Sequence, residues 1–137
     1  MSGRWETLRI FVAMRAKKRC EYCLIHEDDT EMGCQIEHII AEKHGGPTQE
    51  ENLAYACVFC NQYKGSDIAS LLPATDQPVR LFNPRTDRWD DHFSLNGPLI
   101  VPHSDIGRVT VKLLRMNLPV RLEERHLLHS IGRYPPP

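Results

Sequence analysis

Two Cys-x-x-Cys pairs, Cys20/Cys23 and Cys57/Cys60, constrain the fold of this chain more than any other feature. Bare four-cysteine zinc sites usually have about 15–20 residues between their pairs. Here the gap covers residues 24–56, which is long enough to hold a second structural unit. Because thiols of cytosolic proteins stay reduced, we expect the four cysteines to bind one structural Zn²⁺. A disulfide, or free thiols in the core, are the alternatives.

Composition predicts an ordinary globular protein. The chain has 137 residues, of which 41% are hydrophobic, so a packed core is expected rather than disorder. No apolar run approaches the ~18 residues of a membrane span. The short apolar run at residues 10–14 lies between Arg9 and Arg15, unlike that of a signal peptide. We therefore expect a cytosolic protein with no membrane contact, and a buried structural role for the fifth cysteine, Cys34.

The net charge of -1 conceals a strong separation of charge along the chain. Residues 1–20 contain six Lys or Arg residues and one acidic residue, whereas residues 21–51 contain nine acidic residues and one lysine. Basic patches can bind phosphates while an acidic pocket holds divalent cations. A solvated charged surface is the alternative, and composition does not separate the two.

Local patterns predict a strand–loop–strand–helix unit between the cysteine pairs. An amphipathic helix is expected at residues 4–14. The alternation at 34–40 and the apolar run at 53–57 predict two strands joined by a loop at 43–52. A helix should follow at 59–64, where Gly65 can end it. Zinc would hold the outer ends of this ββα unit.

Beyond residue 69 the chain passes a proline-rich connector and reaches two predicted helices. Leu81-Phe82 is expected to add a short strand, and Trp89, His92 and Phe93 should pack near the core. The first helix, residues 105–117, has an apolar stripe of Ile106, Val109, Leu113 and Met116. The second, residues 119–131, begins with a proline in its first turn and has an apolar face of Val120, Leu127 and Ile131 beside Arg121 and Arg125.

Five motifs carry a resemblance to a known family. They are CEYC at 20–23, QIEHII at 35–40, HGG at 44–46, ENLA at 51–54 and CVFCNQYKG at 57–65. Together they resemble an HNH endonuclease of the ββα-metal type with a zinc-binding cysteine quartet. The downstream RLFNPR, Trp89, His92-Phe93 and GRVTVK are similar, less specifically, to small stand-alone bacterial members. The chain departs from the family at Asn61, where His is frequent, which makes it an H-N-N variant, and at Glu37, where Asp is common.

The resemblance implies a fold and a chemistry. The expected fold is α+β, with a small zinc-stapled core of one hairpin plus one helix and flanking N- and C-terminal helices. We expect a single domain over residues 1–137, with its core at about 15–66 and a C-terminal extension at about 78–134. The implied activity is hydrolysis of DNA phosphodiester bonds with Mg²⁺ or Mn²⁺ as a single catalytic ion, leaving a 5′-phosphate.

The resemblance also implies residue roles. Glu37 and Asn61 would bind the catalytic ion through oxygen atoms, the ligands that Mg²⁺ prefers. His38 would be the general base, because its usual pKa near 6.5 suits proton transfer at neutral pH. Asn52 would brace the loop and orient the imidazole of His38.

Each role has a structural alternative. Glu37 could serve as a salt-bridge partner for Lys43 or Lys64 and have no other role. His38 could be a core residue whose ring nitrogens are hydrogen-bonded within the protein. Asn61 could be a helix cap and Asn52 a turn residue. Contacts with the nucleic-acid backbone are expected from His44, Lys64, Arg85, Arg108, Lys112 and Arg115. A loop-surface role for His44 and a solvated helix face for the last three are equally open.

Three classes of function remain at this stage. The first is a metal-dependent DNA endonuclease. The second is a zinc-knuckle module that binds nucleic acid without cutting it, and the third is an RNA-cleaving or toxin-like relative. No base-reading element is evident, so the sequence indicates no recognition site. A targeting partner protein and a homodimer are both possible.

Overall fold

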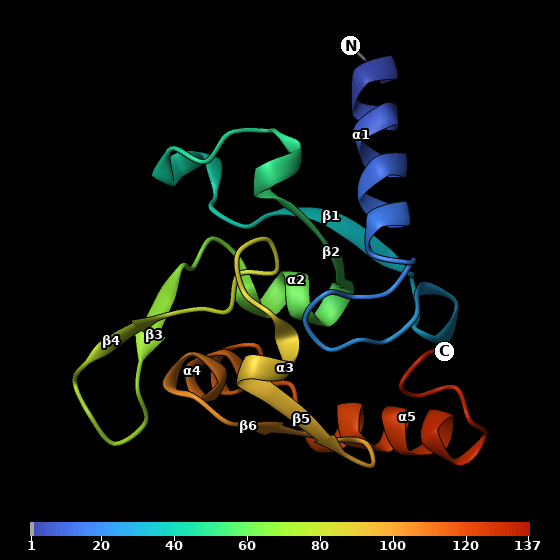
Figure 1. The fold of residues 1–137 in the computed structure, drawn as a ribbon, viewed down its shortest axis with the longest axis vertical. Helices are drawn as coiled ribbons and strands as arrows, with labels where there is room; N and C mark the ends of the chain where they lie inside the picture. Colours follow the sequence, from blue (N-terminus) through green and yellow to red (C-terminus); the bar gives the residue numbers. More distant parts are fainter. Residues whose placement is uncertain (1) are drawn as a thin grey trace.

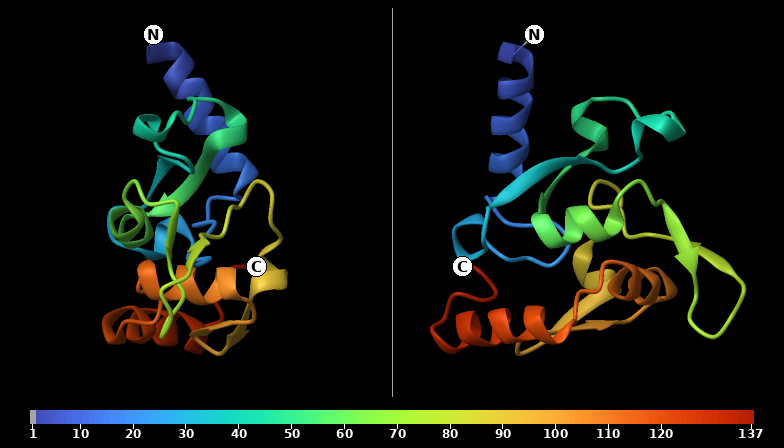
Figure 2. Two further views of the ribbon diagram at one scale, coloured as in Figure 1. Left: turned by 90° about the vertical axis from the view of Figure 1, so that its left-hand side faces the viewer. Right: turned by 180° about the vertical axis from the view of Figure 1, so that it is seen from behind.

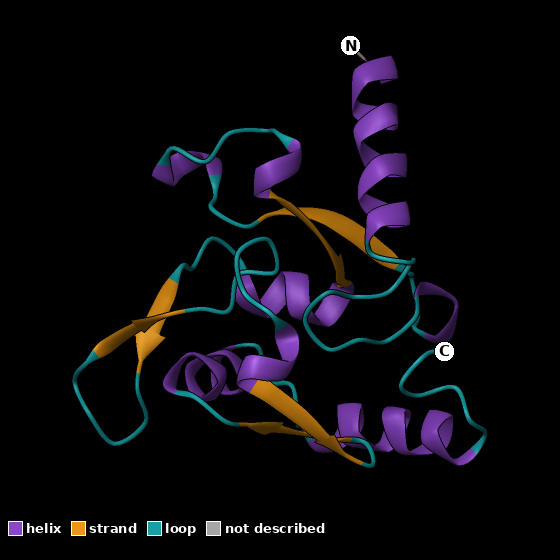
Figure 3. Cartoon of the chain, in the orientation of Figure 1, coloured by secondary structure: helices purple, strands orange, loops and turns teal. Residues whose placement is uncertain are grey.

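The structure is a computed structural model and describes residues 2–137. Within this range the helices are α1 (Ser2–Arg15), α2 (Val58–Lys64), α3 (Trp89–His92), α4 (Asp105–Leu113) and α5 (Pro119–Ser130). The strands form three separate antiparallel hairpins: β1 (Cys34–His38) with β2 (Leu53–Cys57), β3 (Ala69–Leu71) with β4 (Pro78–Arg80), and β5 (Phe93–Asn96) with β6 (Leu99–Pro102) (Figure 3). The fold is therefore mixed α+β. No helix in residues 2–137 is long and apolar enough to cross a membrane.

The hairpin β1–β2 and helix α2 form the expected ββα unit. Cys34 pairs with Cys57 and His38 with Leu53, so the two strands are in register over their whole length. All five residues of β2 are buried, which explains why this strand is continuously apolar. Helix α2 follows without a linker, because the Sγ atom of Cys57 accepts a hydrogen bond from the backbone N–H of Cys60 and caps the first turn. Gly65 ends the helix at a φ of 52°.

The loop between β1 and β2 contains two short 3₁₀ helices, at Glu42–His44 and Glu50–Asn52. It extends away from the hairpin on the side opposite α1, which itself projects from the rest of the chain (Figure 1). The C-terminal half, with α4, β5, β6 and α5, lies on the other side of α2 from the hairpin (Figure 1). The last residues return to the loop that follows the first cysteine pair, as two views show (Figure 2).

Buried side chains from both halves of the chain meet in one hydrophobic cluster. Phe82 is central to its aromatic part: its ring makes edge contacts with Tyr22 at 6.3 Å and with Phe93 at 5.3 Å between centroids. Trp89 donates a hydrogen bond from Nε1 to the carbonyl of Tyr22 at 2.8 Å. Trp89, Phe93 and His92, which contacts Phe82 at 5.9 Å, therefore pack as expected.

Two expectations for the C-terminal half need correction, and one hairpin was not expected. The strand expected at Leu81-Phe82 ends at Arg80, and these two residues instead lie buried in the core. Helix α4 ends at Leu113 rather than at residue 117, and Arg115 takes a positive φ of 49° just after it. The hairpin β5–β6 was not expected from the sequence, although its two-residue loop, Gly97-Pro98, begins with a glycine at a φ of 58°, as tight hairpin turns often do.

The face of α5 that contacts the core is not the apolar one. Val120, Leu127 and Ile131 are 59%, 63% and 68% exposed, whereas Arg121 and Arg125 are 2% and 1% exposed. Burying a guanidinium requires partners for its N–H groups. Both arginines have them: carbonyl oxygens, an amide oxygen and cysteine sulfur atoms. Directed hydrogen bonds therefore outweigh the apolar pattern in orienting this helix.

Candidate functional site

The four paired cysteines form one buried cluster. The Sγ atoms of Cys20, Cys23, Cys57 and Cys60 all lie within 4.8 Å of one another, and the side chains are almost fully buried. Backbone N–H groups of Tyr22 and residue 23 donate to the Sγ of Cys20 at 3.4 Å each, so the chain turns around this sulfur. The cluster joins the first knuckle to the junction of β2 and α2.

The donor set fits tetrahedral Zn²⁺. With Zn–S distances of about 2.3 Å, sulfur atoms at the corners of a tetrahedron are about 3.8 Å apart. The Sγ atoms of Cys23 and Cys57 are 3.7 Å apart. Burial raises the pKa of Cys20 and Cys60, whereas hydrogen bonds from the neighbouring thiols lower the pKa of Cys23. A bound cation would favour the thiolate form of all four.

Cys34 lies outside this cluster. It is the register partner of Cys57 on β1, but it does not belong to the group of sulfur atoms that could hold one ion. Its side chain is buried, and burial raises its pKa to about 12. These properties agree with the expected structural role.

The imidazole of His38 lies at the end of β1, with 21% of its side chain exposed. Its Nε2 is 2.9 Å from the Oγ1 of Thr48, and the Oε1 of Glu42 lies 3.7 Å from the same nitrogen. No hydrogen bond to its Nδ1 is found among residues 2–137. Sequence reasoning missed both neighbours. Glu42 is four residues after His38, a spacing that could have indicated it, whereas Thr48 comes close only through the folding of the loop.

Asn52 braces this loop by three hydrogen bonds. Its Oδ1 accepts from the N–H of Ile40 at 3.0 Å, and its Nδ2 donates to the carbonyls of Ile40 and Pro47 at 2.9 Å each. The backbone at Gly46 lies so close to Ile40 that a Cβ on Gly46 would be 1.7 Å from the Ile40 carbonyl oxygen. Among the described residues, no hydrogen bond joins Asn52 to the ring of His38. Asn52 fixes the residues beside Thr48, and Thr48 is the ring's direct partner.

Glu37 is held in a buried pair with Lys64. The Nζ of Lys64 lies 3.1 Å from Oε1 of Glu37, and the Tyr22 hydroxyl donates to the same oxygen at 2.8 Å. Lys64 also donates to the carbonyls of His38 and Ile39 at 3.3 and 2.8 Å, so it ties α2 to the end of β1. Burial raises the pKa of the Glu37 carboxyl, while the charge of Lys64 and the hydrogen bond from Tyr22 oppose this shift.

Asn61 lies in the second turn of α2. It is not the helix cap, because Cys57 caps the helix. Its Nδ2 donates to the Oε1 of Gln35 on β1 at 2.7 Å. The three expected site residues line one open hollow of about 260 Å³, together with Glu42. The lining includes two acidic residues and an asparagine, whose side chains carry the oxygen ligands that hard divalent cations prefer.

Two of the expected phosphate contacts need correction. Lys64 is 2% exposed, and its ammonium is bound to Glu37 and two carbonyls, so it cannot reach a nucleic-acid backbone. The guanidinium of Arg85 is paired with Glu21 and also donates to the carbonyl of Leu53 at 3.3 Å. The expected contact residues that are exposed are His44, Arg108, Lys112 and Arg115.

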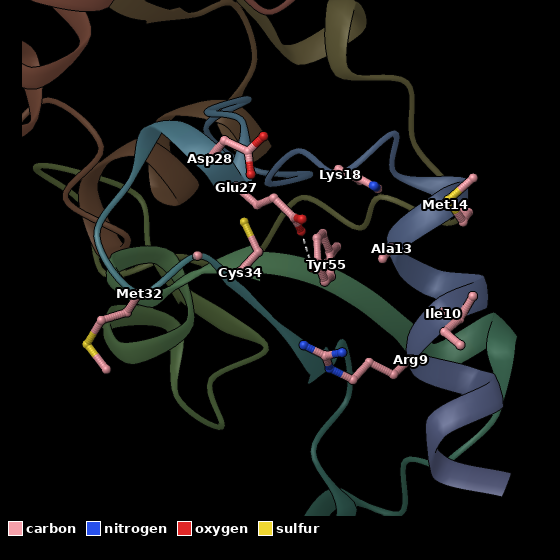
Figure 4. A pocket seen from close by; sticks show the side chains of 11 residues that line it. Arg9, Ile10, Ala13, Met14, Lys18, Glu27, Asp28, Met32, Cys34 and Tyr55 are labelled. Carbon is pink, nitrogen blue, oxygen red and sulfur yellow. Dashed lines mark hydrogen bonds between the residues drawn. The ribbon is translucent and has the colours of Figure 1, made fainter. Parts of the chain in front are cut away.

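A separate hollow of about 490 Å³ lies between α1 and the loop before β1 (Figure 4). Arg9 and Lys18 face it from one side and Glu27 and Asp28 from the other, and Tyr55 donates a hydrogen bond to Glu27 within it (Figure 4). None of the residues expected to bind an ion or transfer a proton lines this hollow. The candidate active site is therefore the smaller hollow beside His38.

The family assignment rests on one comparison. A family model described as HNH endonuclease matches residues 20–67, a segment that contains the cysteine quartet and the residues around His38. No curated protein and no solved structure matches the chain. Residues 20–67 are an HNH endonuclease domain, built around a buried four-cysteine cluster consistent with a zinc site.

Proposed function

We propose that this protein is a divalent-metal-dependent DNA endonuclease that hydrolyses phosphodiester bonds with His38 as its general base. One observation carries the proposal: an acid, an imidazole and a carboxamide, from Glu37, His38 and Asn61, line a single open hollow within the HNH domain. These groups come from the end of β1 and from α2. A module that only binds nucleic acid does not need this combination.

The proton chemistry follows from the surroundings of His38. If its Nε2–H donates to Thr48 Oγ1, the neutral ring presents the lone pair of Nδ1. That nitrogen can take a proton from a water molecule attacking the phosphorus atom. Glu42, near Nε2, would stabilise the imidazolium that results. Thr48 and Asn52 would keep the ring and its loop in place during this step.

Glu37 and Asn61 are the residues proposed to hold the catalytic ion, Mg²⁺ or Mn²⁺. The fit rests on the donor chemistry, since both residues line the same hollow and the side chain of each carries an oxygen atom. Lys64 already binds Glu37, so the ion would share that carboxylate with an ammonium group. When bound, the ion would supply Lewis acidity toward the scissile phosphate and its leaving oxygen.

The proposed DNA contacts are the exposed basic residues of the C-terminal half. Arg108 and Lys112 lie on α4 and Arg115 just after it, and all three are exposed. The guanidinium of Arg115 lies 4.9 Å from the ring centre of Tyr63 on α2, which brings this stripe beside the helix that carries Asn61. Backbone contacts of this kind give salt-sensitive binding with little sequence preference.

The test is conversion of supercoiled plasmid to nicked or linear DNA, with loosely bound metal removed and Mg²⁺ then added back. We expect Mg²⁺-dependent cutting by the parent and a loss of about 10²–10⁴-fold in His38→Ala. His126→Ala, an exposed histidine on α5, is the matched control and should cut normally. Cutting by His38→Ala at the parent rate would exclude His38 as the base.

The same samples separate the alternatives. A parent protein that shifts DNA in a gel but does not cut it with Mg²⁺ or Mn²⁺ would be the non-catalytic binding module. A parent that cuts a structured RNA and leaves plasmid intact would be the RNA-cleaving relative. Zinc content, measured in parallel on each variant, shows whether the four-cysteine cluster is preserved.

A further inference from the structure

A charged side chain from the C-terminal helix reaches the cysteine cluster. Arg121 of α5 is 2% exposed, and its Nη2 lies 3.1 Å from the Sγ of Cys60 and 3.7 Å from that of Cys57. Its Nη1 donates to the carbonyl of Leu114 at 2.8 Å, which fixes the direction of the group. The guanidinium also lies 5.4 Å from the ring centre of Phe59, so its surroundings are closed.

This contact answers an electrostatic problem of the cluster. One Zn²⁺ with four thiolates has a net charge of −2, and a buried charge without a partner is strongly unfavourable. Among the described residues, Arg121 is the one cationic side chain hydrogen-bonded to a cysteine sulfur. An arginine guanidinium stays protonated in proteins, and here its Nη2 donates to two of the sulfur atoms. The group is therefore a fixed positive charge.

We propose that Arg121 is the counter-charge of the zinc–thiolate cluster and sets how tightly the cluster holds its metal. The N–H···S hydrogen bonds stabilise the thiolate form of Cys60 and Cys57, as hydrogen bonds from outer residues do at other metal sites. Arg121 thus acts on the metal from 61 residues downstream of Cys60. It is a positioning residue, and its role does not depend on whether the hollow beside His38 cuts DNA.

The chain supplies a matched control on the same helix. Arg125 lies one turn after Arg121 and is 1% exposed. Its guanidinium donates to the carbonyl of Pro98 at 2.9 Å and to the Oδ1 of Asn117 at 3.0 Å, with no sulfur contact. Arg125→Met therefore removes a buried guanidinium from α5 and leaves the sulfur atoms untouched. Any effect specific to Arg121 must exceed that of this control.

The first measurement is zinc affinity, by competition with a chelator of known affinity. We expect Arg121→Met to bind zinc about 10- to 100-fold more weakly than the parent. Arg121→Lys, which keeps the charge but not the planar fork, should lie between the two. Arg125→Met should lose clearly less affinity than Arg121→Met. Equal losses in the two methionine variants would mean that Arg121 only stabilises the fold, and would overturn the proposal.

The second measurement reports on the sulfur atoms themselves. Co²⁺ in place of zinc gives sulfur-to-cobalt charge-transfer absorption, whose energy falls when a positive charge near the thiolate is removed. We expect a shift to longer wavelength in Arg121→Met and the parent spectrum in Arg125→Met. If Arg121→Met does not fold, the neutral Arg121→Gln takes its place with the same expected direction. A parent-like spectrum in the neutral variant would overturn the proposal.

Discussion

The ammonium of Lys64 lies 3.1 Å from the Glu37 carboxylate although the residues are 27 positions apart, and the two side chains are 2% and 3% exposed. This pair joins α2 to β1 at the edge of the candidate active site. It explains why Lys64, which the sequence predicted to contact the DNA backbone, is unavailable to DNA. It also makes Glu37 a carboxylate whose charge is matched from within the protein.

Removing one member of this pair should strongly destabilise the fold. Lys64→Met leaves a buried carboxylate without its cation, at a cost of about 3–5 kcal/mol in the free energy of unfolding. The double variant Glu37→Gln/Lys64→Met should lose less than the sum of its single variants, because no charge remains unpaired. Urea unfolding of the zinc-loaded proteins measures both, with the exposed Lys43→Met as control. Strict additivity would contradict the pairing.

The ionisation of Glu37 gives a prediction in pH. Its pKa is raised in the folded state by burial, so the folded protein binds this proton more readily than the unfolded chain does. The stability contributed by this group is fully present below the unfolded value of 4.5 and is lost as the pH rises through the folded pKa. Stability of the parent relative to Glu37→Gln should therefore increase as the pH falls through that interval. Both proteins bind zinc through the same cysteines, so the pH dependence of zinc binding cancels when their free energies of unfolding are subtracted.

Carboxyl ¹³C chemical shifts test the same ionisation directly. Lys64 is the largest influence that opposes the raised pKa of Glu37. The titration of Glu37 should therefore move to still higher pH in Lys64→Met and stay at the parent position in Lys43→Met. A movement to lower pH in Lys64→Met would contradict the assigned cause.

The loop brace should be needed for both stability and activity. Asn52→Ala removes three hydrogen bonds and leaves both backbone groups of Ile40 without their partner, at a cost of about 1–3 kcal/mol. Gly46→Ala should be at least as damaging, since its Cβ would overlap the Ile40 carbonyl. Thermal unfolding and plasmid cutting measure the two effects, with the exposed Asn96→Ala as control. Parent-like values in Asn52→Ala would show that the loop holds its shape without the brace.

Thr48 should matter for activity more than for stability. Thr48→Val keeps the side-chain shape but removes the hydroxyl next to His38 Nε2, so the ring loses its orienting partner. We expect a fall of about 10- to 100-fold in the cutting rate. Thr48→Ser keeps the hydroxyl and should recover most of the rate. A uniform rate across the three proteins would assign Thr48 a structural role alone.

Loss of the metal should unfold the domain. A strong zinc chelator should lower the melting temperature markedly, because structural zinc binding and folding are coupled. Cys57→Ser should do the same without chelator, since Cys57 is a cluster member and the cap of α2. Cys34→Ser, on the paired strand but outside the cluster, is the matched control. Equal melting of Cys57→Ser and the parent would exclude a zinc role for the quartet.

Much of the fold follows from local sequence signals, and the exceptions have physical reasons. The bounds of β2 and the start of α4 could be read from apolar patterning and from Ser104, which caps α4. The buried face of α5 could not be predicted in this way, because apolar patterning predicts that Val120 is buried and Arg121 exposed. Only the positions of distant carbonyl and sulfur acceptors reverse that order.

The candidate site shows the same division. The motifs and the family resemblance that they carry selected Glu37, His38 and Asn61, and all three line one hollow. They did not indicate that Thr48 lies against the imidazole, because the return of the loop depends on the close approach at Gly46. They also placed Lys64 among phosphate contacts, since a lysine that faces inward is recognisable only once its acidic partner is located.

Hydrogen bonds from the C-terminal half to the two Cys-x-x-Cys segments limit how the molecule can be shortened. Tyr134 donates to the Cys23 carbonyl at 2.7 Å, Trp89 donates to that of Tyr22, and Arg121 reaches Cys60. A fragment trimmed to residues 20–67 would retain every sulfur ligand yet leave these acceptors facing water. We expect such an excised piece to aggregate or to need added zinc and a complementing C-terminal peptide to stay folded.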